Sequence, residues 1–255
     1  MGAFDKIKKI QNVLILKLKQ RKYKKITYYF EKGNSDVLFV GFSGFPGKIQ
    51  KPLYNYVRTL KPVNANKLFI LDNYGYNGCG SYYLGENGDW FMPEQIKELI
   101  CETQEKYGIK KTVMFGSSKG GTSALYYGMM CSADVVIAAA PQYYIGDYLN
   151  TDSHRSILES IIGSSAKKTK DDLNLLLPDA IHNCKSKPHI IIHYSPCEHT
   201  YNEHIKPLTD DLKSNNFDVT EDNEYTYTEH NDVAKFFPNY LLKCCEEFSV
   251  IKETE

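Results

Sequence analysis

Three glycines surround a pair of serines in the stretch Phe-Gly-Ser-Ser-Lys-Gly-Gly, residues 115–121. In the pattern Gly-x-Ser-x-Gly, the serine occupies the apex of a sharp, strained turn from a strand to a helix, where its hydroxyl can act as a nucleophile. The residues two before and two after the apex must be tiny, because the strand and the helix nearly touch there. Centring the pattern on Ser118 puts Gly116 and Gly120 at those positions, whereas centring it on Ser117 would put phenylalanine and lysine there. Ser118 is therefore the candidate nucleophile.

A serine that attacks a carbonyl group also needs donors for the oxyanion that forms. The backbone N–H of Lys119 is one candidate, because it opens a helix whose positive end points at Ser118. We expect the second donor from a loop after an earlier strand, and the glycine-rich stretch 41–47 offers the N–H of Ser43 or Gly44. The predicted oxyanion hole is therefore Lys119 with Ser43, and Gly44 is the alternative to Ser43.

Two other interpretations of the glycine-rich stretch compete with the nucleophile turn. In a phosphate-binding P-loop the lysine follows the last glycine of Gly-x-x-x-x-Gly-Lys, whereas here Lys119 precedes the glycine pair and would not reach a terminal phosphate. An ordinary turn between a strand and a helix stays open as an alternative.

A nucleophilic serine needs a base and an acid, which in this kind of fold follow it in the order acid, then histidine. His230 lies between the last predicted strand and the final helix, where that histidine belongs. Glu198 follows the predicted strand 189–194 and could accept the Nδ1 proton of His230. Glu203 is a poorer candidate because it should already be helical. A surface histidine without a catalytic role is the alternative for His230.

A rival interpretation makes the same segment a metal site. The side chains of His193, Cys197, His199 and His204 are of the types that bind zinc. Their spacing matches no standard zinc template, and His193 alternates with apolar strand residues like a residue at the rim of a sheet. We therefore expect no metal.

Apolar runs that alternate with helical patterns indicate the elements that position these residues. The fold class is α/β, a mostly parallel central sheet flanked by helices. The expected strands are 26–30, 36–42, 67–72, 111–115, 134–139, 189–194 and 218–227, and the expected helices are 51–59, 93–107, 119–130, 202–214 and 232–248. Short helical pieces over 142–187 are typical of a cap or lid inserted over the carboxyl edge of the sheet. The length of 255 residues suits one such domain, 26–255.

Residues 1–25 form a separate basic segment. They hold nine lysines and arginines against one acidic residue, a formal charge of +8 that leaves −8 on the rest of the neutral chain. Apolar residues recur there at helical spacing, which predicts a basic amphipathic helix, either packed on the domain or in contact with an anionic membrane or polymer. The acidic remainder argues against nucleic acid as a partner.

The location follows from what the sequence lacks. No stretch has the length and flanks of a signal peptide or a membrane span. The seven cysteines are irregularly spaced, which is typical of free thiols in a reducing compartment. We expect a cytoplasmic protein, with contact to the inner face of the membrane as an open alternative.

Taken together, the motifs resemble those of the α/β-hydrolase-fold O-acetyltransferases of bacterial capsular polysaccharides, and more distantly those of accessory-secretion proteins that acetylate sugars. The similarity covers about residues 26–245. It rests on His230 and on five stretches, which are "GSSKGG" followed by "ALYYG", "FSGFP" at 42–46, "GSYYLG" at 80–85 and "APQ" at 140–142.

This resemblance implies the α/β-hydrolase fold and a reaction in which acetyl-CoA acetylates Ser118, which then passes the acetyl group to a sugar hydroxyl of a capsular polysaccharide. Glu198 stands where the similar enzymes usually carry aspartate. Residues 1–25 lie outside the resemblance. The lysines near the site, Lys119 and the pair at 167–168, are candidate contacts of the CoA phosphates.

Two other functions stay open on the sequence alone. An esterase or deacetylase would use the same three residues with water as the acceptor, because the residues themselves do not select the acceptor. A non-catalytic partner in glycan biosynthesis would keep the fold and act through residues 1–25.

Overall fold

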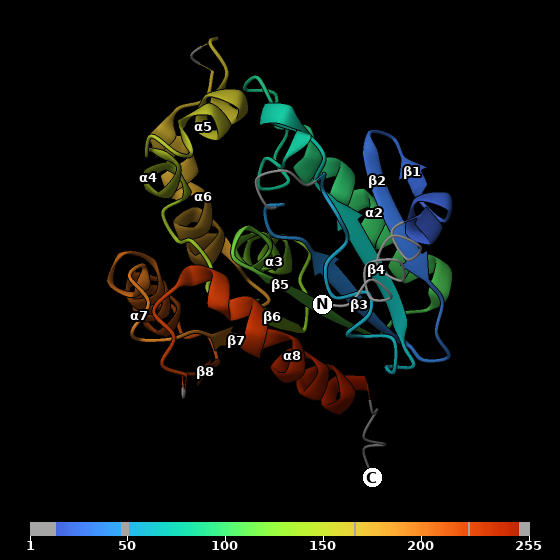
Figure 1. Ribbon diagram of the computed structural model, residues 1–255. Helices are drawn as coiled ribbons and strands as arrows, with labels where there is room; N and C mark the ends of the chain where they lie inside the picture. The colour runs from blue at the N-terminus through green and yellow to red at the C-terminus, as the bar shows by residue number, and fades with distance from the viewer. Residues whose placement is uncertain (1–13, 47–50, 166, 224, 250–255) are drawn as a thin grey trace, which may run out of the picture.

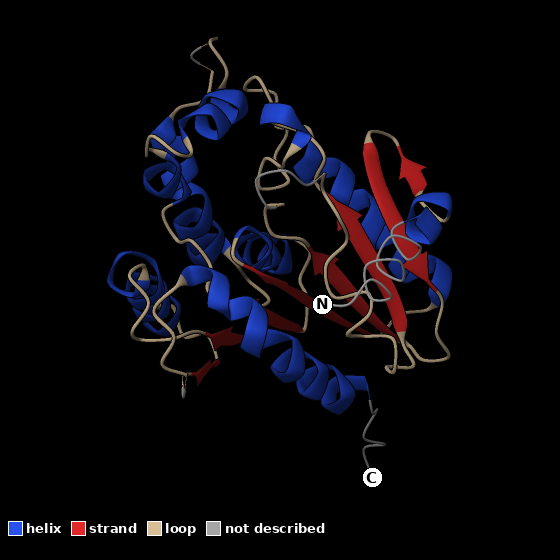
Figure 2. Cartoon of the chain, in the orientation of Figure 1, coloured by secondary structure: helices blue, strands red, loops and turns tan. Residues whose placement is uncertain are grey.

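The computed structural model describes residues 14–46, 51–165, 167–223 and 225–249. Their strands form one eight-stranded sheet in the order β1-β2-β4-β3-β5-β6-β7-β8 (Figure 2). The strands are β1 (Arg21–Tyr23), β2 (Ile26–Glu31), β3 (Val37–Phe42), β4 (Asn66–Leu71), β5 (Lys111–Ser117), β6 (Val135–Ala139), β7 (His189–His193) and β8 (Val219–Asp222).

The six strands from β4 across to β8 pair in parallel, and β2 runs antiparallel to both of its neighbours, β4 and the edge strand β1. The predicted strands are present, except that β8 ends at Asp222 rather than 227. The short edge strand β1 was missed, because its three residues, of which the first two are exposed, carry no alternating pattern. Parallel strands bring their carboxyl ends to one edge, and Ser117 and His193 end β5 and β7 there.

Helices cover both faces of the sheet (Figure 1). The apolar residues of α2, α3, α6 and α7 pack in one core, and those of α8 pack in a second core across the sheet. The helices are α2 (Met92–Tyr107), α3 (Lys119–Met130), α4 (Ile145–Leu149), α5 (Arg155–Ile162), α6 (Lys170–Asn183), α7 (Lys206–Ser214) and α8 (Val233–Ser249), with short helical turns at η1 (Tyr76–Gly78), η2 (Tyr201–Ile205) and η3 (His230–Asp232).

Strand β3 shows why the sequence selects this layered arrangement. All six of its residues are buried. Leu38 and Val40 belong to one core, whereas Val37 and Phe39, which point to the opposite face, belong to the other. A strand that is apolar on both faces needs cover on both, and parallel sheets obtain it from crossover helices.

The expected helix over 51–59 is wrong. This segment forms turns, and Tyr56 has a left-handed φ of 63° that a helix does not allow. Tertiary contacts hold it instead, since the N–H of Asn55 donates to Ser43 Oγ at 3.0 Å and the Tyr56 hydroxyl lies 2.5 Å from Ser117 Oγ.

The segment 142–187 contains α4, α5 and α6 and lies between β6 and β7 in the chain. Most of the predicted amphipathic helix, residues 1–13, falls outside the described residues, and 14–18 are helical. Within the described part of the chain, no helix combines the length and the apolar character needed to cross a bilayer.

Candidate active site

Ser118 lies at the turn between β5 and α3 with the backbone strain that the motif predicts. Its φ and ψ are 52° and −126°, a conformation that is costly for a residue with a side chain. A Cβ on Gly116 would lie 2.3 Å from the carbonyl oxygen of Gly120, and a Cβ on Gly120 would lie 2.3 Å from that of Phe42. The absence of a side chain on the two glycines therefore lets strand β5, helix α3 and the end of β3 approach closely, as the sharp turn requires.

The structure brings Ser118, His230 and Glu198 into one hydrogen-bonded chain. The Ser118 hydroxyl lies 2.8 Å from His230 Nε2, although 112 residues separate them in sequence. On the other side of the ring, Nδ1 lies 2.5 Å from Glu198 Oε1. Thr200 also donates to that oxygen, at 2.6 Å. Because Nδ1–H donates to the carboxylate, Nε2 of a neutral ring is left as the acceptor that faces the serine.

Glu198 is suited to stay ionised beside His230. Burial raises the pKa of this carboxyl, but its hydrogen bond with His230 and the attraction of that ring outweigh the burial and hold the pKa below its ordinary value. The Glu198 side chain is 1% exposed and that of His230 18%, so the pair is shielded but open to a ligand at the histidine. A carboxylate fixed in this way orients the ring and stabilises its protonated form.

The two predicted oxyanion donors have different outcomes. No hydrogen bond within the described residues involves the N–H of Lys119, which lies directly after Ser118 at the start of α3. The N–H of Ser43, in contrast, already donates to the Tyr83 hydroxyl at 2.6 Å. The expectation of an unpaired N–H at Ser43 is therefore wrong. The alternative, Gly44, has no partner for its N–H among the described residues.

Gln142 is a site residue to which the sequence assigned no role. Its side-chain Nε2 donates to Ser118 Oγ at 3.2 Å and to the carbonyl oxygen of Ala140 at 3.2 Å. The Thr122 hydroxyl lies 2.8 Å from the backbone nitrogen of Gln142 and holds the segment against α3. The feature of the sequence that could have indicated a role for Gln142 is its position just after β6, at the carboxyl edge of the sheet.

The Lys119 side chain does not point to solvent. Its Nζ lies 2.7 Å from Asp72 Oδ2, and the two side chains are 1% and 0% exposed. Burial lowers the pKa of Lys119, and Asp72 partly offsets that effect. Asp72 also accepts the N–H groups of Ser81 and Tyr83, at 2.7 and 3.0 Å. The Lys119 ammonium is thus enclosed, and the expected contact between this lysine and CoA phosphates is wrong.

The structure gives His193 of the rival metal interpretation a different partner. Among the described residues, no group of three or more histidine, cysteine, aspartate or glutamate side chains is placed to hold a metal ion. His193 pairs with Asp222, Nδ1 to Oδ2 at 2.6 Å, and its buried Nε2 has no hydrogen-bond partner among the described residues.

We expect His193 to make the protein sensitive to acid. Burial lowers the pKa of this histidine more than its contact with Asp222 raises it, whereas a histidine in the unfolded chain titrates near about 6.5. Below that pH the unfolded state binds more protons, so the free energy of unfolding falls as pH falls. His193→Asn keeps a donor toward Asp222 but removes the titrating ring. The free energy of unfolding of this variant should therefore fall by about 1 kcal/mol less than that of wild type between about pH 7.5 and 5.5. Urea unfolding at the two pH values checks this, and an unchanged loss would contradict it.

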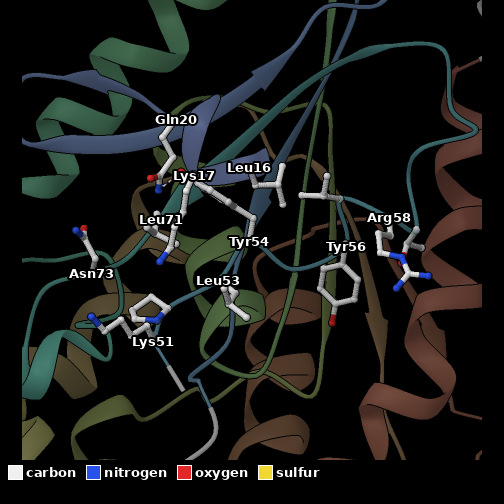
Figure 3. Close-up of a pocket in the computed structure, with 13 residues that line it drawn as sticks. Leu16, Lys17, Gln20, Lys51, Leu53, Tyr54, Tyr56, Arg58, Leu71 and Asn73 are labelled. Carbon is white, nitrogen blue, oxygen red and sulfur yellow. Dashed lines mark hydrogen bonds between the residues drawn. The ribbon is translucent and has the colours of Figure 1, made fainter. Parts of the chain in front are cut away.

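A cavity of about 920 Å³ opens beside His230. Three segments line it, namely 144–154 from the insertion, 199–204 after β7, and 229–231 before α8. A second cavity, of about 410 Å³, is lined by residues of the segment 51–59 together with residues from 16–20 and 71–73 (Figure 3). Neither Ser118 nor His230 lines this second cavity, whose wall includes Lys17, Lys51 and Arg58.

The parallel sheet, its flanking helices and the turn at Ser118 are the features of the α/β-hydrolase fold, and comparison with solved structures confirms this class. The capsule O-acetyltransferase of Neisseria meningitidis serogroup A, as a histidine-to-alanine mutant in complex with CoA, superposes with a TM-score of 0.75 at 20% identity, over 89% of this chain and 94% of its own. A fluorophosphonate-binding serine hydrolase of Staphylococcus aureus, FphF, superposes with a TM-score of 0.62 at 13% identity, over 91% of this chain and 97% of its own.

The glycosylation-associated Gap123 complex of Streptococcus agalactiae is also similar, with a TM-score of 0.67 at 15% identity, over 88% of this chain and 44% of that one. No protein-family model and no curated protein sequence matches this chain. At these identities the likeness establishes the fold. It also confirms the predicted resemblance to capsule O-acetyltransferases at the level of tertiary structure.

Proposed function

We propose that this chain is a serine-dependent O-acetyltransferase that moves an acetyl group from acetyl-CoA, through acetyl-Ser118, to a hydroxyl of a bacterial surface polysaccharide. The observation that carries the proposal is the hydrogen-bonded chain from Ser118 through His230 to Glu198, with distances of 2.8 and 2.5 Å. The similarity to a capsule O-acetyltransferase in complex with CoA supports the choice of donor.

In the first half of the proposed reaction, His230 Nε2 takes the proton of Ser118 as Oγ attacks the thioester carbonyl. The oxygen of the tetrahedral intermediate is negatively charged, and the N–H groups of Lys119 and Gly44 are the donors that we assign to it. When the carbon–sulfur bond breaks, the protonated His230 gives its proton to the CoA thiolate. The products are acetyl-Ser118 and CoA.

In the second half, a sugar hydroxyl takes the place of CoA. His230 removes the hydroxyl proton while the sugar oxygen attacks the acetyl carbonyl, and the bond to Ser118 Oγ then breaks. Oγ recovers a proton from His230, which regenerates the free serine. Glu198 stabilises the imidazolium in both halves, because its buried carboxylate accepts a hydrogen bond from Nδ1–H throughout.

Mass spectrometry of the intact protein after brief exposure to acetyl-CoA tests the proposal. We expect one added acetyl group on the peptide that contains Ser118, because the acetyl-enzyme accumulates when no sugar is present. Ser118→Ala should carry none. An acetyl group on a different residue, or release of CoA while the protein stays unmodified at every time point, would contradict the proposed intermediate.

Hydrolysis is the second candidate, and the similarity to a substrate-bound serine hydrolase favours it. Water would then replace the sugar in the second half, with the same three residues in the same roles. An assay in which glycan competes with water for the acetyl group distinguishes the two functions. In a transferase, an added glycan diverts the acetyl group from water, whereas an esterase cleaves simple acetyl esters at a rate that glycans do not change.

The partners follow from the same proposal. The acceptor is a polysaccharide, the protein acts in the cytoplasm, and residues 1–25 contact the membrane surface or the capsule-assembly machinery through their positive charge. In the described part of this segment, Leu14, Ile15 and Leu18 are exposed apolar side chains, which supports a surface contact.

A further inference from the structure

The cavity beside His230 is the place where an acceptor hydroxyl can reach the base. Its volume of about 920 Å³ lies at the upper end of the range of about 300–1,000 Å³ usual for small-molecule sites. His230 forms part of its wall, and a general base must come within hydrogen-bond distance of the proton that it removes. The chemistry of the remaining wall therefore bears on the class of acceptor.

The wall of this cavity carries carboxylates and histidines. Asp147, Glu203 and Glu229 line it beside four histidines, and no lysine or arginine of the described residues does. Lys170 neutralises Asp147 from outside, with Nζ at 2.5 Å from Oδ1, whereas the ion pairs of the described residues include neither Glu203 nor Glu229. These two carboxylates can accept hydrogen bonds from sugar hydroxyls or amines, and they repel carboxylate, sulfate and phosphate groups.

A buried histidine adds a directed donor to the same wall. His204 is 3% exposed, and its Nδ1 accepts the backbone N–H of Tyr144 at 3.3 Å. Burial lowers the pKa of this histidine, so the ring stays neutral and its one hydrogen lies on Nε2. Nε2 has no hydrogen-bond partner among the described residues, and the ring lines the cavity. A fixed N–H donor without a partner suits the oxygen of a bound sugar.

Two aromatic rings complete the wall. Tyr144 and Tyr148 line the cavity, and the Tyr148 ring is stacked on His154 at 5.1 Å between centroids. Flat rings with polar ends pack on the apolar faces of sugars while their edges stay hydrated. Aromatic faces beside hydrogen-bonding side chains indicate a carbohydrate rather than a purely apolar ligand.

The anionic donor has a different surface available. The cavity in Figure 3 has Lys17, Lys51 and Arg58 on its wall, and none of its described lining residues is an aspartate or glutamate. Tyr56, on the same wall, lies 2.5 Å from the hydroxyl of Ser117, the residue before Ser118. The phosphates of CoA thus need not enter the carboxylate-lined cavity, which leaves that cavity to the acceptor.

We propose that the cavity beside His230 binds the acceptor as a glycan without acidic groups, in which His204 donates to a sugar oxygen and Glu203 and Glu229 accept from sugar hydroxyls or amines. This inference rests on the proposed function and specifies its substrate class. It excludes polymers whose repeating units carry carboxylate, sulfate or phosphodiester groups at the position that enters the cavity.

Glycan binding without turnover tests this inference. The Ser118→Ala protein is applied to an array of neutral, amino-bearing and acidic bacterial polysaccharides, and dissociation constants are then measured for the strongest neutral ligand and for its carboxylated counterpart. We expect the neutral glycan to bind at least about tenfold more tightly than the acidic one. Strongest binding to acidic glycans, or binding to none, would overturn the proposal.

Two sets of variants test whether the preference for neutral glycans arises from the wall of this cavity. Glu203→Gln with Glu229→Gln should narrow the difference between neutral and acidic glycans to less than about threefold, because the repulsion is gone. His204→Phe should weaken the neutral glycan by about fivefold or more. The control Glu94→Gln with Glu105→Gln makes the same change of charge on exposed positions of α2, and should leave the difference intact. A difference that persists in the Glu203 and Glu229 variant would also overturn the proposal.

The result is separable from that of the proposed function. Acetylation of Ser118 by acetyl-CoA is measured without glycan, and glycan selectivity is measured without acetyl-CoA. A protein that forms acetyl-Ser118 but prefers acidic glycans refutes this inference alone. A protein that prefers neutral glycans but is never acetylated refutes the proposed function alone.

Discussion

Ser118→Ala is expected to reduce acetyl transfer to a glycan by about ten-thousand-fold or more, because removal of the nucleophile leaves only binding and the oxyanion donors to lower the barrier. The turn itself tolerates the change, since its geometry depends on Gly116 and Gly120 rather than on the serine hydroxyl. The initial rate of CoA release in the presence of glycan measures the effect, and the thermal midpoint of unfolding shows that the variant is folded.

The neighbouring serine supplies a matched control. Ser117 Oγ contacts the Tyr56 hydroxyl at 2.5 Å, whereas Ser118 Oγ contacts His230. Ser117→Ala removes the same atom one residue earlier and should keep the rate within about threefold of wild type. If the Ser118 variant kept most of its activity, or if Ser117→Ala abolished it, the assignment of the nucleophile would be refuted.

Asp72→Asn is expected to lower the free energy of unfolding by about 3 kcal/mol, because it leaves the Lys119 ammonium buried without a counter-charge. Both side chains are almost completely enclosed, at 1% and 0% exposure. The double variant with Lys119→Met removes both charges and should recover part of the loss. Urea unfolding of the two variants measures the effect.

An exposed ion pair provides the comparison for this second prediction. Lys206 and Asp210 are 56% and 60% exposed at an N···O distance of 2.7 Å. Asp210→Asn should therefore cost about 0.5 kcal/mol or less. If Asp72→Asn and Asp210→Asn lowered the free energy of unfolding by the same amount, the explanation from burial would be refuted.

The buried pair also connects the two sides of the proposed oxyanion hole. Asp72 binds Lys119 Nζ and the N–H of Tyr83, and the Tyr83 hydroxyl accepts the N–H of Ser43 at 2.6 Å. The loop that carries Ser43 and the start of α3 are thereby held through one network of hydrogen bonds. Loss of the pair should lower the rate of acetyl transfer as well as stability, because oxyanion donors act only when they are positioned in advance.

Local patterns in the sequence were sufficient to predict the sheet and the nucleophile turn. The strand β3 is apolar on both faces, and the tiny residues Gly116 and Gly120 flank Ser118. Such patterns depend on neighbours in the chain, so propensity and spacing reveal them. The chain order of acid and histidine, with each placed after a later strand, then identified Glu198 and His230 as the residues to examine.

The failures arose where distant residues decide the local structure. The segment 51–59 has a helical pattern, but contacts of Asn55 with Ser43 and of Tyr56 with Ser117 hold it in turns. Lys119 was a candidate contact of the CoA phosphates, yet its ammonium is buried against Asp72, 47 residues earlier in the chain. Tertiary contacts override local preference in both cases.

The sequence by itself therefore determined the α/β class, the turn that carries Ser118 and the identity of the three side chains that meet there. Only the tertiary structure decided which groups are free to act. It pairs the N–H of Ser43 with Tyr83, brings Gln142 to Ser118, and joins three separate segments around a cavity beside His230. The reason is physical, because periodicity and turn chemistry are encoded locally, whereas the partner of a polar group depends on atoms brought together across the fold.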